Sequence, residues 1–376
     1  MKITDVEVIV VRQDEVKMIG DGSQDTAVVL VHTDEGITGV GEVDSAPEVV
    51  KAIVEAPSSH DQCRGLKTIL MGEDPTNIEY LWYKMYYYSY YYTRRSVGIH
   101  AMSGIDIALW DITGKKYGLP VSKLLGGRFR EKIPAYCSVL MPDSKKGIDE
   151  LVAHHKADCN YHGYKFGWGA LGESEKKDVE LVEYCRKAVG DDARLMIDIG
   201  MRWTDYKYAL RVAKEYEKQK LYWLEEPFAP DRTEDFGRLA DNMNISLASG
   251  EEFGTMYEFK DMLDNGKVDI VQPDMSRCGG ITMAKKIADM AQLRGKKLIP
   301  HAFKTGILIG ATLQLIAAIP NADMLEYCAQ ETVLSKNLVK HHFTLDKDGN
   351  VTIPSVAGIG VELNEEILNK YRRNAK

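Results

Sequence analysis

This chain of 376 residues lacks a long apolar run. Its longest, residues 306–320, contains Thr312 and Gln314 and falls short of the roughly 20 residues that cross a bilayer. Residues 1–5 lead directly into an alternating pattern, without the apolar core of a signal peptide. We therefore expect no membrane partner and a cytoplasmic location.

Cysteine and positive charge are also scarce. The six cysteines are scattered without paired spacing, at Cys63, Cys137, Cys159, Cys185, Cys278 and Cys328. In a chain of this length that spacing is typical of a reduced protein. The 48 Lys and Arg residues are outnumbered by 56 Asp and Glu, which gives a formal charge of −8 and argues against nucleic acid as a partner.

The first 130 residues show strand patterns followed by helix patterns, the order typical of an α+β domain. The expected strands are 3–11, 26–33 and 37–42, and the expected helices are 48–56, 76–88 and 101–117. An acidic Gly turn at 34–36 predicts a hairpin between the second and third strands. The tyrosine-rich stretch 80–88 has helical spacing, which indicates a packing face.

Two loops in this region, 13–25 and 44–65, carry Gly, Ser and Asp residues. Loops of this kind either close over a substrate and determine which stereoisomer fits, or serve as exposed connections. Both interpretations stay open at this point.

From residue 131 the pattern changes to short apolar runs that alternate with helix-like segments. The runs are 134–140, 163–166, 194–197, 221–224, 245–248, 268–271, 297–299 and 323–325. Eight such alternations predict an α/β fold, a modified (β/α)8 (TIM-like) barrel with an α+β capping domain. We expect the cap at 1–130, the barrel at 131–328, and a segment at 329–376 that returns to the cap.

Three carboxylates each follow one of these runs: Asp198, Glu225 and Glu251. They are 27 (225 − 198) and 26 (251 − 225) residues apart, close to the about 30 residues of a strand–helix–strand unit. Each would then lie at the carboxyl end of a parallel strand, where a barrel gathers its active site. One such acid alone is commonly a helix cap, but three in near-register indicate a metal site, and oxygen ligands favour Mg²⁺.

The later strand ends carry Asp274, His301 and Glu326. On neighbouring strands, Asp274 and His301 can pair, and a carboxylate on one imidazole nitrogen makes the other a usable base near neutral pH. Lys165, at the end of the second run, points to catalysis more weakly, because lysines at strand ends commonly face solvent.

Several motifs together resemble the mandelate racemase subgroup of the enolase superfamily. They are Trp-Leu-Glu-Glu-Pro at 223–227, Ser-Gly-Glu at 249–251, Val-Gln-Pro-Asp at 271–274 with Gly-Gly-Ile-Thr at 279–282, Ile-Pro-His at 299–301, and Ile-Asp-Ile-Ala-Leu-Trp-Asp at 105–111. The resemblance covers nearly the whole chain and implies an α+β cap on a modified barrel. It also implies that Asp198, Glu225 and Glu251 hold Mg²⁺, which binds the substrate carboxylate.

The same resemblance assigns further roles. His301 would be the base that removes the proton next to the substrate carboxylate, with Asp274 as its partner. Glu326, when protonated, would donate to the resulting enediolate. Members of this family commonly form dimers and octamers, so we expect a homo-oligomer.

Two departures from the family pattern narrow the reaction. Relatives that racemise carry Lys-x-Lys on the second strand, whereas here the tripeptide is Lys165-Phe166-Gly167, which lacks the base for the opposite face. Lys165 itself assists the carboxylate, acts as a second acid, or does neither. Many relatives place Asn where this chain has Gly200, so a substrate hydroxyl contact must come from elsewhere, with Trp168 and Arg202 as candidates.

These features predict a Mg²⁺-dependent acid sugar dehydratase that converts an aldonate or aldarate into a 2-keto-3-deoxy acid. Protonated His301 would then also serve as the acid for the departing water. The alternatives are a racemase or epimerase of a hydroxy acid in the same superfamily, and a barrel that binds its ligand without catalysis.

Overall fold

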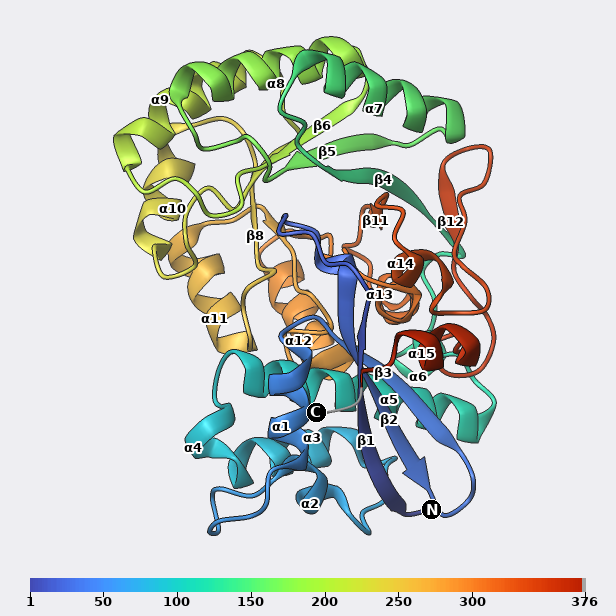
Figure 1. Ribbon diagram of the computed structural model, residues 1–376. Coiled ribbons are helices and arrows are strands. Elements are labelled where there is room, and N and C mark those ends of the chain that lie inside the picture. Colours follow the sequence, from blue (N-terminus) through green and yellow to red (C-terminus); the bar gives the residue numbers. More distant parts are fainter. Residues whose placement is uncertain (374–376) are drawn as a thin grey trace.

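The computed structural model describes residues 1–373 and contains two separate sheets. In Figure 1 the blue cap lies below the green-to-orange barrel, and the loop after the first strand reaches up toward the barrel strands. The cap sheet is antiparallel and consists of β1 (Ile3–Arg12), β2 (Asp25–Thr33) and β3 (Thr38–Val43). A short 3-10 turn, η1 (Gly22–Gln24), precedes β2.

The predicted hairpin and helices of the cap are confirmed. Gly36, with φ of 79°, adopts the left-handed conformation that the β2–β3 turn requires. The helices are α1 (Pro47–Glu55), α2 (Leu66–Leu70), α3 (Ile78–Tyr88), α4 (Tyr90–Thr93), α5 (Val97–Tyr117) and α6 (Val121–Leu124). Helix α5 lies so close to β3 that a Cβ on Gly41 would be 1.9 Å from the carbonyl oxygen of Gly104.

The parallel sheet confirms the barrel prediction. Adjacent strands in this sheet follow the order β10-β9-β8-β7-β6-β5-β4-β11. The strands are β4 (Lys132–Leu140), β5 (Gly163–Gly167), β6 (Arg194–Asp198), β7 (Trp223–Glu225), β8 (Leu247–Ser249), β9 (Ile270–Val271), β10 (Lys297–Leu298) and β11 (Leu325–Cys328). A bridge between Leu298 and Ala322, just before β11, closes the ring. Such closure brings all the carboxyl ends of the strands to one rim.

A helix follows each strand from β4 to β10. These helices are α7 (Lys145–Asp158), α8 (Glu175–Val189), α9 (Tyr206–Glu217), α10 (Thr233–Asn242), α11 (Met256–Asp261) with the π-helix η2 (Met262–Gly266), α12 (Gly280–Leu293) and α13 (Gly306–Ala318). The sequence shows no helical periodicity for α13, because every one of its residues is buried and it has no polar face.

The bounds predicted for the last strand, 323–325, are wrong. The strand β11 begins at Leu325 and pairs with β4 from Ala135 onward. Asp323 precedes it and instead accepts hydrogen bonds from Tyr222 and from Lys297, the latter at 3.0 Å. Glu326 is therefore inside a strand rather than after one.

The carboxyl-terminal segment contacts both sheets. It contains α14 (Val333–Asn337), β12 (Asn350–Thr352), which runs antiparallel to β4, and α15 (Glu365–Tyr371). Beyond α15, Arg372 bridges Val11 of β1. The expected domain boundaries stay a prediction, and residues 374–376 of the expected returning segment lie outside the described part.

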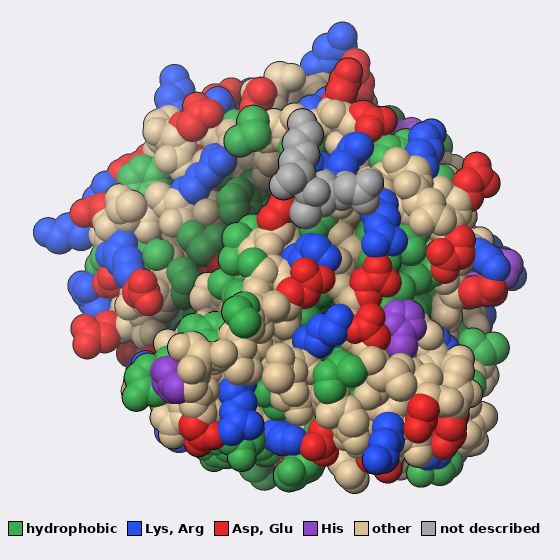
Figure 2. All heavy atoms as spheres, turned by 60° about the horizontal axis from the view of Figure 1, so that its bottom comes forward, with side chains coloured by type: hydrophobic (Ala, Val, Ile, Leu, Met, Phe, Trp, Pro, Cys, Tyr) green, Lys and Arg blue, Asp and Glu red, His purple; other side chains and the backbone are tan. Residues whose placement is uncertain are grey.

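Two observations on the described chain concern nucleic acid and membrane as partners, both of which the sequence argues against. On the face that Figure 2 presents, cationic and anionic side chains are interspersed. None of the helices within residues 1–373 is both long and apolar enough to traverse a bilayer. The six cysteines are free thiols.

A buried carboxylate joins the cap to the barrel. Asp106 on α5 accepts hydrogen bonds from the Thr282 amide at 3.0 Å and from the Thr282 hydroxyl at 2.5 Å. Burial raises the pKa of Asp106 to about 7, from an ordinary value of 3.8. Since the folded pKa is the higher one, this group stabilises the fold fully below about pH 4, and that contribution is lost as the pH rises through 7.

We expect Asp106→Asn to remove this pH dependence. Between pH 5 and pH 8 the free energy of unfolding of the unmodified protein should fall by about 2–3 kcal/mol relative to the variant. Urea unfolding at both pH values measures this difference. The exposed Asp289→Asn on α12 is the control, and parallel pH profiles for the Asp106→Asn variant and the unmodified protein would contradict the account.

Candidate active site

A cavity of about 280 Å³ lies at the carboxyl ends of the barrel strands. Its floor includes Lys165, Asp198 and Glu251, and cap residues 19–22 form part of its wall. Both loops whose role the sequence left open therefore border the cavity, the second through Asp44.

The structure brings the three predicted metal ligands together. Asp198 and Glu225 are paired neighbours at the ends of β6 and β7, and Glu251 follows β8. One oxygen from each lies within 4.8 Å of the others, and all three side chains are buried. Burial, and then the neighbouring carboxylates, raise the pKa of Asp198. A buried, anionic, all-oxygen donor set of this kind fits a hard divalent cation.

The carboxylate of Glu225 is held in place on both oxygens. Its Oε2 accepts hydrogen bonds from the indole of Trp223 at 2.7 Å and from the amide of Gln272 at 3.0 Å. Its Oε1 accepts from the ammonium of Lys165 at 2.5 Å. Such secondary contacts orient a ligand before a metal binds.

Lys165 is buried and does not face solvent. Its Nζ lies 2.5 Å from Glu225, 2.8 Å from Glu326 and 3.8 Å from Asp198. Burial alone would lower the pKa of Lys165, but Glu225 and Glu326 raise it well above the ordinary value. The side chain is therefore a fixed positive charge between the metal ligands and Glu326.

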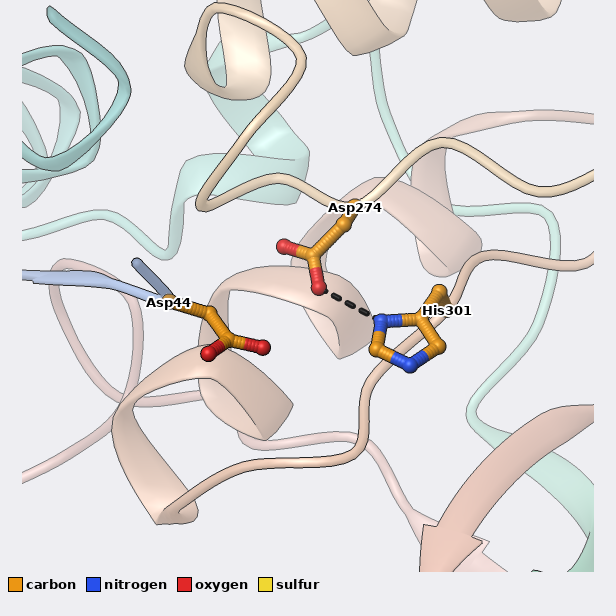
Figure 3. A group of neighbouring side chains, drawn as sticks. All are labelled: Asp44, Asp274 and His301. Atoms are coloured by element: carbon orange, nitrogen blue, oxygen red, sulfur yellow. Dashed lines mark hydrogen bonds and ion pairs between the residues drawn. The ribbon is translucent and has the colours of Figure 1, made fainter. Parts of the chain in front are cut away.

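His301 and Asp274 form the predicted pair (Figure 3). The Nδ1 of His301 lies 2.7 Å from Oδ2 of Asp274, whose Oδ1 accepts from the Ser276 amide and hydroxyl, both at 2.6 Å. The Nε2 of His301 lies 3.4 Å from Glu251 and 3.9 Å from Glu326. Nε2 is thus the nitrogen available to exchange a proton in the cavity.

The charge on His301 depends on these neighbours. Burial would lower the pKa of His301, but Glu251 and Glu326 outweigh that effect and raise it to about 10. A cation held by Glu251 would oppose this effect and favour the neutral base.

Glu326 is surrounded by hydrogen-bond donors. It accepts from the Ser138 hydroxyl at 2.8 Å, from the Ala302 amide at 2.7 Å and from Lys165. Burial would raise the pKa of Glu326, but Lys165 and His301 lower it to about 2. It is an ionised acceptor in this arrangement, and the predicted donor role would require it to gain a proton when its partners change.

The two candidate substrate contacts have different positions. Trp168 lines the cavity, with its indole between two glycines: a Cβ on Gly200 would be 2.7 Å from the ring, and one on Gly20 would be 3.2 Å away. The indole therefore occupies the space that an Asn side chain at 200 would need. Arg202 is not brought into the cavity, because its exposed guanidinium donates to the carbonyl oxygens of Gly169 and Leu171.

The missing second base also has a structural counterpart. A Cβ on Gly167 would lie 2.8 Å from Oδ2 of Asp198. No side chain fits there without displacing this predicted metal ligand.

A cluster that is not predicted from the sequence joins the cap to this site: Asp44, Arg277 and Lys304. Asp44 follows β3, and its carboxylate lies 2.6 Å from Lys304 and 2.5 Å from Arg277. Each cation comes three residues after a member of the catalytic pair, which is the one signal the sequence offered.

Asp44, Asp274 and His301 also form a group with ligand atoms within 4.8 Å of one another (Figure 3). Lys304 and Arg277 already neutralise Asp44, so a cation would have to compete with them. The arrangement fits a set of ion pairs that joins the cap to the barrel better than it fits a second metal site.

Two family models match the chain. Residues 4–126 match the mandelate racemase / muconate lactonizing enzyme amino-terminal domain, and residues 148–367 match the enolase carboxyl-terminal domain-like model. Together these matches cover both the cap and the barrel.

Individual proteins are similar over almost the whole chain. A D-galactarolactone cycloisomerase from Agrobacterium fabrum is 31% identical, covering 92% of this chain and 90% of its own. An arabinonate dehydratase from Saccharolobus solfataricus is 30% identical, covering 95% and 93%.

Solved structures agree with this similarity. The 3,6-anhydro-D-galactonate cycloisomerase from Zobellia galactanivorans superposes with a TM-score of 0.89 at 31% identity and covers 100% of both chains. A racemase from Streptomyces coelicolor A3(2) with bound magnesium has a TM-score of 0.87 at 25% identity, covering 99% of this chain and 100% of that one.

The contact between Trp168 and Gly200 generates a prediction about packing. Gly200 has φ of 60°, which Asn tolerates, so Gly200→Asn tests the clash rather than backbone strain. We expect the substitution to lower the free energy of unfolding by about 1–3 kcal/mol, because the side chain overpacks the indole. In a Trp168→Ala background the same substitution should cost less than about 1 kcal/mol, as urea unfolding of the double-mutant cycle measures. Equal costs in both backgrounds would contradict the assigned contact.

Proposed function

Because this chain belongs to the mandelate racemase / muconate lactonizing enzyme family of the enolase superfamily, we propose that it is a Mg²⁺-dependent acid sugar dehydratase. The observation that carries the proposal is the placement of His301. Its Nδ1 is held by Asp274, and its Nε2 faces the cavity between Glu251 and Glu326. No matching base is possible at Gly167.

Asp198, Glu225 and Glu251 would hold the cation. When bound, Mg²⁺ supplies a positive charge that attracts the substrate carboxylate and stabilises the negative charge that develops beside it. Lys165 adds a fixed positive charge at the same end of the cavity. The substrate carboxylate is therefore oriented toward this end, with the adjacent carbon near His301.

The chain's own residues then move one proton. Nε2 of His301 takes the proton from the carbon next to the carboxylate, while the hydrogen bond from Nδ1 to Asp274 fixes the tautomer. The hydroxyl on the next carbon departs with that proton as water. The enol that remains converts to the 2-keto-3-deoxy acid.

This arrangement favours elimination over the racemase or epimerase alternative. Inversion needs proton exchange on both faces of the carbon. Lys165, the cation nearest to Gly167 in sequence, is held by Glu225 and Glu326. The non-catalytic alternative has less support, since both the buried carboxylates and the histidine pair are intact.

A cycloisomerase is the second candidate, because two similar proteins carry that name. The same proton removal would then expel a ring oxygen instead of a free hydroxyl. The products distinguish the two reactions: a dehydratase product is lighter than its substrate by one water, whereas a cycloisomerase product has the same mass.

We expect His301→Asn to lower kcat by about 10²–10⁴-fold or more, since it removes the general base. The same variant should lose exchange of the α-proton with D₂O, while its thermal unfolding stays cooperative. His154→Asn, an exposed substitution on α7, is the control for the chemical change. Turnover at the unmodified rate in the His301→Asn variant would reject His301 as the base.

The metal site has its own test. Glu225→Gln should weaken Mg²⁺ binding by more than about 10-fold, the loss that removal of a supporting partner alone can cause. Isothermal titration calorimetry with MgCl₂ measures the affinity, and Glu215→Gln, at a partly exposed position on α9, is the matched control. Unchanged Mg²⁺ affinity in Glu225→Gln would rule out this carboxylate as a ligand.

A further inference from the structure

The charges that line the cavity distinguish between two classes of acid sugar. An aldonate carries one carboxylate and ends in a neutral hydroxymethyl group, whereas an aldarate carries a carboxylate at both ends. An enzyme that accepts an aldarate needs a positive group for the second carboxylate. The described residues that line the cavity include three basic side chains: Lys165, Arg277 and His301.

Two of these basic groups belong to the reacting end. Lys165 lies against Glu225 and Glu326, and His301 is bonded to Asp274. Both are therefore committed to the first carboxylate and to the proton transfer. Only Arg277 remains as a partner for a second carboxylate.

The guanidinium of Arg277 has five N–H donors and already makes four hydrogen bonds, two of them to carboxylates. Its Nη2 lies 2.5 Å from Oδ2 of Asp44, and its Nε donates to the Asp44 carbonyl oxygen at 3.2 Å. Its Nη1 donates to Glu252 at 3.1 Å and to the Glu251 carbonyl oxygen at 3.3 Å. Turning it toward a ligand would break these contacts with a buried carboxylate, which is costly.

The cap loop contributes a negative charge to the cavity wall. Asp21 in the cap loop lines the cavity, and both hydrogen bonds to its side chain come from Ser23, a neutral residue, at 2.9 and 2.6 Å. Lys304 is buried behind this loop. Its ammonium donates to the Gly22 carbonyl oxygen and to the Asp44 carboxylate, so it is not available to a ligand. Phe303 and Trp168 complete the wall around Asp21.

We propose that the substrate is an aldonate-type monocarboxylate whose far end is a neutral polyhydroxyl chain, an inference that rests on the proposed function. A hydroxyl can donate to the Asp21 carboxylate, and charge-assisted bonds of that kind are strong. A second carboxylate would meet Asp21, and every basic side chain in the lining within residues 1–373 is already paired with an acid, so the like charges would repel.

The test compares matched pairs of acids of the same configuration, such as galactonate with galactarate and gluconate with glucarate. The full-length enzyme with Mg²⁺ should turn over the aldonate with a kcat/KM at least about 100-fold above that of its aldarate. An aldarate used as well as or better than its aldonate overturns this inference and leaves the dehydratase proposal intact. Failure of every acid to react or to exchange its α-proton rejects the proposed function, and this inference with it.

A variant locates the selectivity at Asp21. Asp21→Asn removes the charge but keeps an oxygen for the Ser23 amide, and Asn is as good a helix cap as Asp. We expect the ratio of kcat/KM for aldonate to that for aldarate to fall by at least about fivefold, through a lower KM for the aldarate. Asp205→Asn, which changes an exposed capping aspartate on α9, should leave the ratio unchanged. An unchanged ratio in Asp21→Asn as well would refute the role of Asp21.

Discussion

Mutual repulsion among buried carboxylates is the constraint on which the rest of this site depends. Asp198, Glu225 and Glu251 are buried at adjoining strand ends, with one oxygen of each within 4.8 Å of the others. Groups so close cannot all be ionised without positive charge beside them. Lys165 supplies part of it, and the remainder defines a site for a divalent cation. The same negative charge acts on His301 through Glu251, so a cation held by Glu251 would also favour the neutral form of this histidine.

The cap carries further ion pairs to the edge of the cavity. Arg277 and Lys304 hold Asp44, and Lys304 also holds the carbonyl of Gly22 in the cap loop. These contacts hold the loop over the strand ends, and they leave both Arg277 and Lys304 paired with Asp44. The loop held in this way places Asp21 in the lining of the cavity, where Trp168 also lies.

Much of this arrangement could be predicted from the sequence, because strand ends of a barrel meet at one rim. Apolar runs that are each followed by an acid predict that Asp198, Glu225 and Glu251 lie together. Contacts between distant segments could not be found this way: nothing local to Asp44 indicates that it meets Arg277. Helix α13 lacked a polar face, and the space beside Gly200 is filled by Trp168, which follows a different strand. Arg202, expected at the substrate, satisfies nearby carbonyl groups instead.

The central claim is that one base on one face removes the α-proton and elimination follows. The most direct measurement is the reaction of an acid sugar substrate in D₂O with Mg²⁺, followed by NMR of product and recovered substrate. The account predicts a 2-keto-3-deoxy acid with a single deuterium at C3 and recovered substrate of unchanged configuration. Recovered substrate with deuterium at C2 and inverted configuration, without keto acid, would contradict it and indicate a second base.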